Sequence, residues 1–303
     1  MNSVIITGAT GMIGIGLIEH CIKHRMKVVA VVRENSENIS RIPISEYVEV
    51  VECNLNNLSS LKSLSGIYDT FYHFGWDGTY GNARNDVSIQ LKNIEYTLEA
   101  VKVAKELGCK RFVGSGSQAE NGFVENILNE NTLANPQIPY GIGKYSAGKM
   151  SRILCQQLGM QHIWTRVFSV FSPYDHKNTM VRYAIETLLK GEIPEFTKAE
   201  QNWNYLYYKD AGKAFFLLGE KGRDGETYCV ASRTTSLLKS YIERIRDCVN
   251  ADMPLGIGVK PYPANISMHI SVDVSKIVKE IGFVEEYSFE DGILDIVKHG
   301  YGK

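Results

Sequence analysis

Two side chains in the middle of the chain could move a proton. Tyr140 and Lys144 lie four residues apart in a segment that introduces a helix, so both fall on one helical face. A free tyrosine has a pKa of about 10, so its use at neutral pH requires the pKa to fall to about 7, which corresponds to roughly 4 kcal/mol. A neighbouring lysine favours the phenolate. We expect Tyr140 to exchange a proton with a carbinol oxygen while a hydride moves. Taken alone, however, a Tyr-x-x-x-Lys pair is also common in helices.

Hydroxyl groups follow the predicted strand that ends near residue 114. Ser115 and Ser117 lie in the turn Gly-Ser-Gly-Ser-Gln. The carboxyl ends of parallel strands are where open α/β sheets bind their ligands. Ser115 and Ser117 are therefore candidates for holding the oxygen of a substrate, although each by itself would be an ordinary turn residue.

A glycine-rich loop lies between the first predicted strand and the first predicted helix, with the spacing GxxGxxG. Glycine allows a tight turn and the approach of backbone N–H groups to a pyrophosphate. The helix N-terminus adds a partial positive charge. The loop therefore predicts a dinucleotide site. The residues expected to contact the dinucleotide are Gly8, Thr10, Gly11, Met12, Ile13 and Gly14.

The end of the second predicted strand bears on which dinucleotide binds. The chain reads Val-Val-Arg-Glu from residue 31, with no acid at the strand end and Arg33 directly after it. An acid there would bind a ribose 2′-hydroxyl, whereas an arginine accommodates a 2′-phosphate. Arg33 favours NADP. NAD stays open, because Arg33 could be a solvated loop charge and Glu34 is adjacent.

The first half of the chain alternates short β-rich runs with helical patterns. Near-continuous Val/Ile strands separated by helices predict parallel strands covered on both faces, and hence a doubly wound (Rossmann) α/β sheet. The expected strands are 4–7, 27–32, 48–52, 70–74, 111–114 and 163–168, and the expected helices are 12–24, 58–64, 88–107 and 144–158.

The pattern loosens after residue 170. We expect residues 1–170 to form the cofactor domain and residues 171–303 a smaller α/β substrate domain, with 203–231 packing back on the first. The later elements are expected as helices near 177–190, 209–220 and 236–248, a strand at 227–230, and two helices between 273 and 299 around Gly282.

Composition excludes several classes of protein. The 303 residues carry 33 Lys plus Arg against 34 Asp plus Glu, so neither nucleic acid nor an anionic membrane is an expected partner. Residues 1–18 are uncharged but contain four glycines and no basic leader, which fits neither a signal peptide nor a membrane span. Six dispersed cysteines, without CxxC or His spacing, predict reduced thiols, no metal site and a cytoplasmic location.

Taken in order, the glycine loop, Ser117 and Tyr-Gly-Ile-Gly-Lys from residue 140 resemble the extended short-chain dehydrogenase/reductase superfamily. More narrowly, the chain is similar to the NAD-dependent epimerase/dehydratase family, which acts on nucleotide sugars. The resemblance covers nearly the whole chain and includes landmarks at 69–76, 166–173, 204–210 and 273–292. It implies that Ser117 is the catalytic hydroxyl, that Tyr140 is the acid/base, and that Lys144 binds the nicotinamide ribose and lowers the tyrosine pKa.

The resemblance also implies further contacts and a homodimer that pairs through the helices expected at 88–107 and 144–158. Met150, Ile153 and Leu154 could instead face the sheet as core residues. His73 is expected to be a packed strand residue. The implied cofactor contacts are Arg33, Asn54, Leu55, Phe74, Gly75, Trp76, Asn93, Tyr140, Lys144 and Phe168, and the implied substrate contacts are Ser117, Gln118, Tyr140 and Ser169.

Departures from the family pattern narrow the reaction. Gln118 and Ala119 replace the Asp-Glu pair of the 4,6-dehydratases, and no cysteine lies near this turn as in the C3/C5 epimerases. Two hydride reactions remain: NADPH-dependent reduction of a nucleotide-activated 4-keto-6-deoxy sugar, as in polysaccharide biosynthesis, or 4-epimerisation with retained NAD. A non-catalytic NADP-binding regulator is a third reading, which predicts loss of Tyr140 or Lys144.

Other departures from the family pattern concern contacts with the substrate and the cofactor rather than the reaction itself. Ser169 replaces the usual Asn of the sugar-lining segment, and Gly143 replaces the usual Ser before the lysine. Asn54 stands where an Asp often contacts adenine. These changes leave the identity of the sugar and of the nucleotide open.

Overall fold

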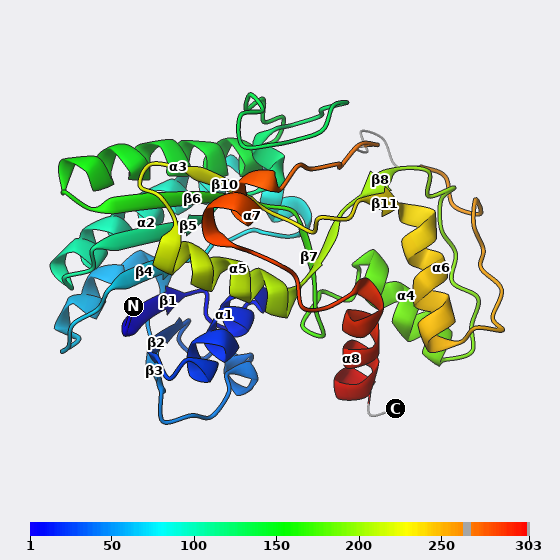
Figure 1. Cartoon of the computed structure of the whole chain (residues 1–303), viewed down its shortest axis with the longest axis horizontal. Helices are drawn as coiled ribbons and strands as arrows, with labels where there is room; N and C mark the ends of the chain where they lie inside the picture. The colour runs from blue at the N-terminus through cyan, green and yellow to red at the C-terminus, as the bar shows by residue number, and fades with distance from the viewer. Residues whose placement is uncertain (263–267, 302–303) are drawn as a thin grey trace.

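A seven-stranded parallel sheet forms the centre of the protein (Figure 1). The computed structural model describes residues 1–262 and 268–301. Every pair of neighbouring strands runs parallel, in the order β10-β6-β5-β4-β1-β2-β3. The predicted doubly wound sheet is confirmed. Its strands are β1 (Ser3–Thr7), β2 (Lys27–Val32), β3 (Val48–Glu52), β4 (Thr70–His73), β5 (Arg111–Ser115), β6 (Gln161–Val167) and β10 (Thr227–Val230).

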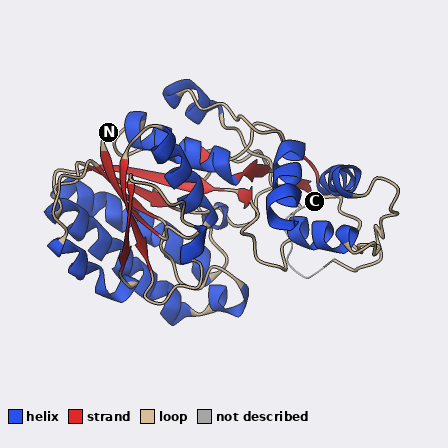
Figure 2. Cartoon of the chain, turned by 90° about the horizontal axis from the view of Figure 1, so that it is seen from below, coloured by secondary structure: helices blue, strands red, loops and turns tan. Residues whose placement is uncertain are grey.

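Helices cover both faces of this sheet (Figure 2). Successive residues of a strand point to opposite faces, so Val4 and Ile6 enter one hydrophobic core while Ile5 enters the other. The first core is closed by α1 (Met12–Lys23), α5 (Tyr208–Lys221) and α7 (Ser275–Ile281), and the second by α2 (Val87–Glu106), α3 (Pro139–Gln157) and the 3-10 segment Leu55–Ser63.

The second half of the chain contributes to both parts of the molecule. β10 and α5 belong to the sheet and its covering layer, so residues 208–230 pack against the first half. The remaining elements form a smaller group at the right of Figure 1. They are α4 (Met180–Leu189), α6 (Leu238–Val249), α8 (Phe289–Tyr301), the antiparallel pair β8 (Asn202–Trp203) with β11 (Ser236–Leu237), and the parallel pair β7 (Ser169–Phe171) with β9 (Tyr205–Tyr207).

Two predicted helices differ from those observed. The helix expected from 144 begins at Pro139, because proline suits the first turn of a helix. This earlier start places Tyr140 inside the helix. The helix expected at 58–64 is a 3-10 segment that starts at Leu55 and is broken at Asn57.

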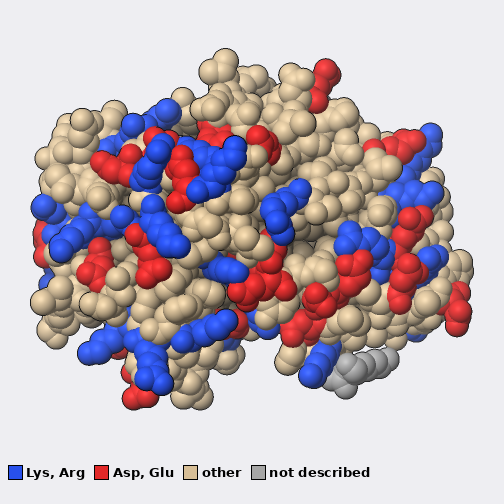
Figure 3. Space-filling view, viewed as in Figure 1, with Lys and Arg blue, Asp and Glu red and all other residues tan. Residues whose placement is uncertain are grey.

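Charged side chains are mixed rather than grouped by sign. On the face drawn in Figure 3, Lys and Arg side chains alternate with Asp and Glu side chains. Within residues 1–262 and 268–301, no helix combines the length and apolarity needed to cross a membrane. The same residues contain no group of three or more His, Cys, Asp or Glu side chains placed to hold a metal ion. Five of the six cysteines are buried, and Cys248 is half-buried.

We predict that α1 and α5 tolerate no side chain where their backbones meet. A Cβ atom on Gly16 would lie 2.3 Å from the carbonyl oxygen of Tyr208. Gly16→Ala should therefore lower the free energy of unfolding by about 1–3 kcal/mol or more, measured by denaturant titration. Gly300→Ala, near the end of α8 with nothing within 4 Å, is the control and should not destabilise the protein. Equal stability of both variants would contradict this prediction.

Candidate active site

The glycine loop packs against the residues that follow β4. Gly8 has a φ of +67°, which a side chain disfavours, and a Cβ atom there would lie 2.7 Å from the backbone nitrogen of Gly75. A Cβ atom on Gly14 would lie 2.6 Å from the carbonyl oxygen of Gly8. Gly11, by contrast, is exposed and has free space beside it except for the Gly8 carbonyl oxygen at 3.2 Å. The loop is thus packed closely against neighbouring backbone at Gly8 and Gly14, and it is open to solvent at Gly11.

The start of α1 fits the pyrophosphate of a dinucleotide. Gly11 is the N-cap residue, and no side chain accepts a hydrogen bond from the first turn. That turn also contains no acidic residue. Backbone N–H groups of an uncapped helix start are ready donors for an anion. Thr10, Met12 and Ile13, predicted as cofactor contacts, are half-buried around this start.

Other predicted cofactor residues gather at the same edge of the sheet. Leu55 touches Gly75 so closely that a Cβ atom on Gly75 would lie 2.7 Å from Leu55 Cδ2. Arg33 is exposed directly after β2. Asn54 Oδ1 accepts a hydrogen bond from the backbone of Glu34 at 3.3 Å, which ties the end of β3 to the end of β2. Phe74 packs edge-on against Phe215 of α5, with ring centres 4.7 Å apart. The structure therefore brings these residues together beside the glycine loop.

Ser117 lies in the turn between β5 and a 3-10 helix, Gln118–Glu120. Its hydroxyl accepts a hydrogen bond from the backbone of Ala119 at 3.2 Å. Its backbone N–H donates to Oε1 of Glu120 at 2.9 Å, so the two residues form a capping box. The capping box holds the backbone of Ser117 next to the end of β5.

Lys144 is buried behind the turn. Nζ donates a hydrogen bond of 2.6 Å to the carbonyl oxygen of Ser115, and it lies 3.9 Å from the centre of the Trp76 ring. Burial lowers the pKa of Lys144 to about 7, while the nearby Glu120 carboxylate opposes this change. Trp76 is fixed in turn, because its Nε1 donates to Oε1 of Gln90 at 2.8 Å.

Tyr140 is also buried, and Arg84 is the cation that faces it. Burial raises the pKa of the Tyr140 phenol, whereas Arg84 and a hydrogen bond with Ser117 lower it. The Arg84 guanidinium carbon is 4.1 Å from the centre of the Tyr140 ring, and Lys144 Nζ is 5.9 Å from it. Arg84 is therefore the cation nearer to the Tyr140 ring, and the role expected of Lys144 toward the Tyr140 pKa stays a prediction.

Arg84 and Glu120 are functional candidates that the motifs did not indicate. Arg84 lies in the 3-10 segment Gly81–Asn85 after β4, and Nη1 donates to the carbonyl oxygen of Thr79 at 3.1 Å. Arg84 belongs to no spacing pattern, and its position depends on how separate loops meet. Glu120 completes the capping-box spacing Ser-x-x-Glu that begins at Ser117, and this spacing was the available signal for it.

The remaining predicted residues occupy different environments. Both polar atoms of the buried Asn93 side chain bond to the backbone of Asp77, at 2.9 and 2.8 Å, so Asn93 holds the loop after β4. Oε1 of Gln118, the residue after Ser117, is buried and has no hydrogen-bond partner in the structure. Buried acceptors are normally hydrogen-bonded, so this oxygen is available to a donor on a bound molecule. Phe168 is buried, and Ser169 is half-buried in β7. His73 is a packed strand residue, and burial lowers its pKa to about 3.

Comparison with known proteins places this arrangement in a family. Residues 4–231 match the model of the NAD dependent epimerase/dehydratase family. The chain belongs to this family. The family predicted from the motifs is thereby confirmed, and the protein is an enzyme of the nucleotide-sugar epimerase/dehydratase type.

Relatives and solved structures of this family match nearly the whole chain. A dTDP-glucose 4,6-dehydratase of Salmonella typhimurium is 22% identical, covering 97% of this chain and 91% of the relative. A UDP-N-acetylglucosamine 4-epimerase of Methanobrevibacter ruminantium, solved with UDP-N-acetylmuramic acid, has a TM-score of 0.86 at 23% identity, covering 98% of this chain and 97% of that one. A dTDP-glucose 4,6-dehydratase of Streptomyces venezuelae, solved with NAD bound, has a TM-score of 0.83 at 19% identity, covering 98% and 96%. These structures share the fold of this chain.

We predict that the buried Lys144 makes the stability of this family member depend on pH. Its pKa is lowered to about 7 in the folded protein from the usual 10.5. The unfolded chain therefore binds more protons between these values, and the destabilisation is complete below pH 7 and fades as the pH rises to 10.5. Lys144→Met should raise the melting temperature more at pH 6 than at pH 9.

The control for this measurement is Lys149→Met, which changes an exposed lysine of the same helix. The difference in melting temperature between Lys149→Met and the wild type should be the same at pH 6 and at pH 9. The prediction would be refuted if the gain in melting temperature of Lys144→Met over the wild type stayed constant or grew as the pH rises.

Proposed function

We propose that the protein is an NADPH-dependent reductase of a nucleotide-activated 4-keto-6-deoxy sugar. The observation that carries this proposal is a buried Tyr140 with the Arg84 guanidinium over its ring, beside positions 118 and 119, which hold neither acid nor base. Such a site can move one proton to or from a sugar oxygen. It lacks the second acid and base that elimination of water from the sugar would need.

Tyr140 is the proton donor in this proposal. Its phenol protonates the oxygen of the ketone as the carbonyl carbon gains a hydride, so that a C=O group becomes CH–OH. Ser117 donates a hydrogen bond to the same oxygen, and the Gln118 side chain contacts the sugar. Arg84 stabilises the phenolate that remains on Tyr140, because a cation close to a developing anion lowers its energy. Water then restores the phenol.

The cofactor is held by the glycine loop and by Lys144. The backbone at the start of α1 binds the pyrophosphate, and Lys144 binds the ribose next to the nicotinamide. When bound, the reduced nicotinamide supplies the hydride. Arg33 supports NADP, because an exposed guanidinium after β2 is suited to a 2′-phosphate.

Glu120 does not replace the missing dehydratase acid. It is next to positions 118 and 119, yet its carboxylate is 2% exposed and bonds to Ser117 and Trp164. Both of these bonds are to Oε1, while Oε2 lies 3.6 Å from Nε of Arg166, so the carboxylate faces donors of the protein. This supports hydride transfer without elimination.

The second candidate is a nucleotide-sugar 4-epimerase with tightly bound NAD. The likeness to 4-epimerases, and to a dehydratase with NAD bound, favours this reading. In it, Tyr140 removes the proton from a C4 hydroxyl and later returns it to the opposite face of the sugar ring. The same residues serve both reactions. The two reactions differ in the cofactor, because reduction consumes NADPH whereas epimerisation regenerates the bound NAD.

We expect the reduced cofactor to be consumed in proportion to one keto sugar. The purified protein is incubated with NADPH or NADH and a panel of nucleotide 4-keto-6-deoxy sugars, and the near-ultraviolet absorbance of the cofactor is followed. NADPH should be preferred, and Tyr140→Phe should slow the reaction by about a hundredfold or more. Conversion of a nucleotide hexose to its 4-epimer without net absorbance change would favour the epimerase instead.

We also propose a homodimer that forms through α2 and α3. These helices pack on each other, and four apolar side chains on them are about half exposed: Leu91, Ile142, Met150 and Ile153. Met150 and Ile153 are therefore not core residues of the sheet, whereas Leu154 is half-buried against it. An exposed apolar stripe on two neighbouring helices is suited to a second copy of the chain.

If the dimer forms through this apolar stripe on α2 and α3, charged side chains placed in the stripe should separate the two copies. Met150→Glu combined with Ile153→Glu should convert a dimer to a monomer in sedimentation velocity experiments, because a like-charged stripe opposes its own copy. Ile44→Glu, at an exposed apolar residue away from these helices, should leave the dimer intact. A monomeric wild-type protein would refute the proposal.

The cell compartment and pathway remain proposals too. All six cysteines are free thiols, and burial raises the pKa of each of them. Free thiols support a reducing compartment. We place the enzyme in the cytoplasm, in polysaccharide biosynthesis.

A further inference from the structure

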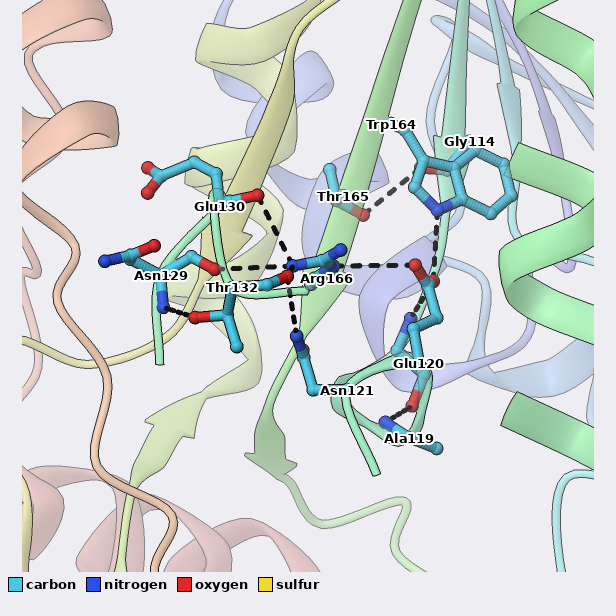
Figure 4. A network of polar contacts seen from close by, with 11 residues as sticks. Gly114, Ala119, Glu120, Asn121, Asn129, Glu130, Thr132, Trp164, Thr165 and Arg166 are labelled. Carbon is cyan, nitrogen blue, oxygen red and sulfur yellow. Dashed lines mark hydrogen bonds and ion pairs between the residues drawn. The ribbon is translucent and has the colours of Figure 1, made fainter. Parts of the chain in front are cut away.

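A buried carboxylate lies directly behind the turn that carries Ser117. Glu120 is 2% exposed, and Figure 4 shows it between the turn and β6. Oε1 accepts the backbone N–H of Ser117 at 2.9 Å and the indole N–H of Trp164 at 3.0 Å. Oε2 lies 3.6 Å from Nε of Arg166. Both oxygens of this carboxylate therefore face donors that belong to the protein.

The donors on β6 are themselves fixed. Nη1 of Arg166 donates to three backbone carbonyl oxygens, at 3.3 Å to Asn129, 3.4 Å to Glu130 and 2.9 Å to Thr132 (Figure 4). Arg166 cannot swing away without leaving a buried charge unpaired, which is costly. The carboxylate of Glu120 is therefore anchored to the sheet on one side and to the Ser117 turn on the other.

The turn leaves room for this carboxylate because residue 116 is glycine. A Cβ atom on Gly116 would lie 2.1 Å from Oε1 of Glu120 and 2.4 Å from Nε1 of Trp164. Any side chain there would push the carboxylate off the Ser117 amide. The Gly-Ser-Gly-Ser segment and Glu120 thus form one packing unit.

We propose that Glu120 is the positioning residue for Ser117 in the reaction. The inference rests on the proposed function, in which the Ser117 hydroxyl binds the sugar oxygen. Glu120 fixes the backbone of Ser117 through a hydrogen bond to a charged acceptor, a kind that is about twice as strong as a neutral one. If the Ser117 hydroxyl moves by a small part of its distance to the reacting sugar oxygen, the hydrogen bond between them weakens. Glu120 acts through Ser117, because its Oε1 accepts from the Ser117 amide and its Oε2 lies against Arg166.

A double-mutant cycle tests whether Glu120 acts through Ser117. Glu120→Gln keeps the length of the side chain but removes its charge, and it should lower kcat about tenfold while leaving KM for NADPH unchanged. Ser117→Ala removes the hydroxyl. Adding Glu120→Gln to Ser117→Ala should lower kcat no further, because the group being positioned is already absent. Two effects that multiply in the double variant would overturn the inference.

Glu130→Gln is the matched control. Glu130 lies in the same network, but its side chain has no bond to Ser117; its backbone oxygen accepts from Arg166. This variant should keep the wild-type kcat. All variants are compared by thermal unfolding, and a kcat loss in Glu130→Gln equal to that in Glu120→Gln would show a general effect of charge and would overturn the inference.

A measurement without substrate separates this inference from the proposed function. The protein is labelled with 15N-serine, and the Ser117 amide is assigned by its absence in Ser117→Ala. Its proton signal should move upfield in Glu120→Gln and stay in place in Glu130→Gln. An unmoved signal would overturn the role of Glu120 whatever the enzyme does. A moved signal in a protein that reduces none of the keto sugars would uphold the hydrogen bond and refute the proposed function.

Discussion

The contact between the glycine loop and the end of β4 determines where the rest of the site lies. Strand order reverses between β1 and β4, so the loops after these strands leave the sheet side by side. Gly8 sits against Phe74 and Gly75 with no room for a Cβ atom. This contact sets the position of α1 relative to the loop that carries Trp76 and Arg84. The cofactor loop and the residues around Tyr140 are therefore parts of one packed edge.

Buried charge is the second constraint on this edge. Lys144, Glu120 and Arg166 are each less than a tenth exposed, and each is held by fixed partners: Lys144 by a carbonyl oxygen and an indole ring, Glu120 by two N–H donors, Arg166 by three carbonyl oxygens. Charges removed from water interact strongly with their neighbours. Loss of water is the main reason why the pKa of Lys144 falls to about 7. Burial likewise raises the pKa of the Tyr140 phenol, and the nearby Arg84 charge lowers it. The protein sets its acid–base chemistry by packing rather than by net charge.

The second half of the chain carries weaker local signals than the first. β1 to β6 and their helices follow strong hydrophobic periodicity, so their existence and order were predictable. β7, β8, β9 and β11 are two or three residues long, and strands this short have no readable period. Their pairing depends on distant partners, as when Trp203 in β8 faces Ser236 in β11. The aromatic run from 203 to 208 indicated buried structure there without indicating which strands it would form.

The sequence by itself determined the doubly wound fold, the glycine loop, the spacing of Tyr140 and Lys144, and the family. Each of these is a local pattern, carried by residues close together in the chain. The tertiary structure alone decided that Arg84 lies nearer the Tyr140 ring than Lys144, and that Trp164 and Arg166 of β6 face the carboxylate of Glu120. Both results depend on segments from different strands meeting at one edge. Charges a few ångströms apart in space, but far apart in the chain, leave no periodic signal in the sequence.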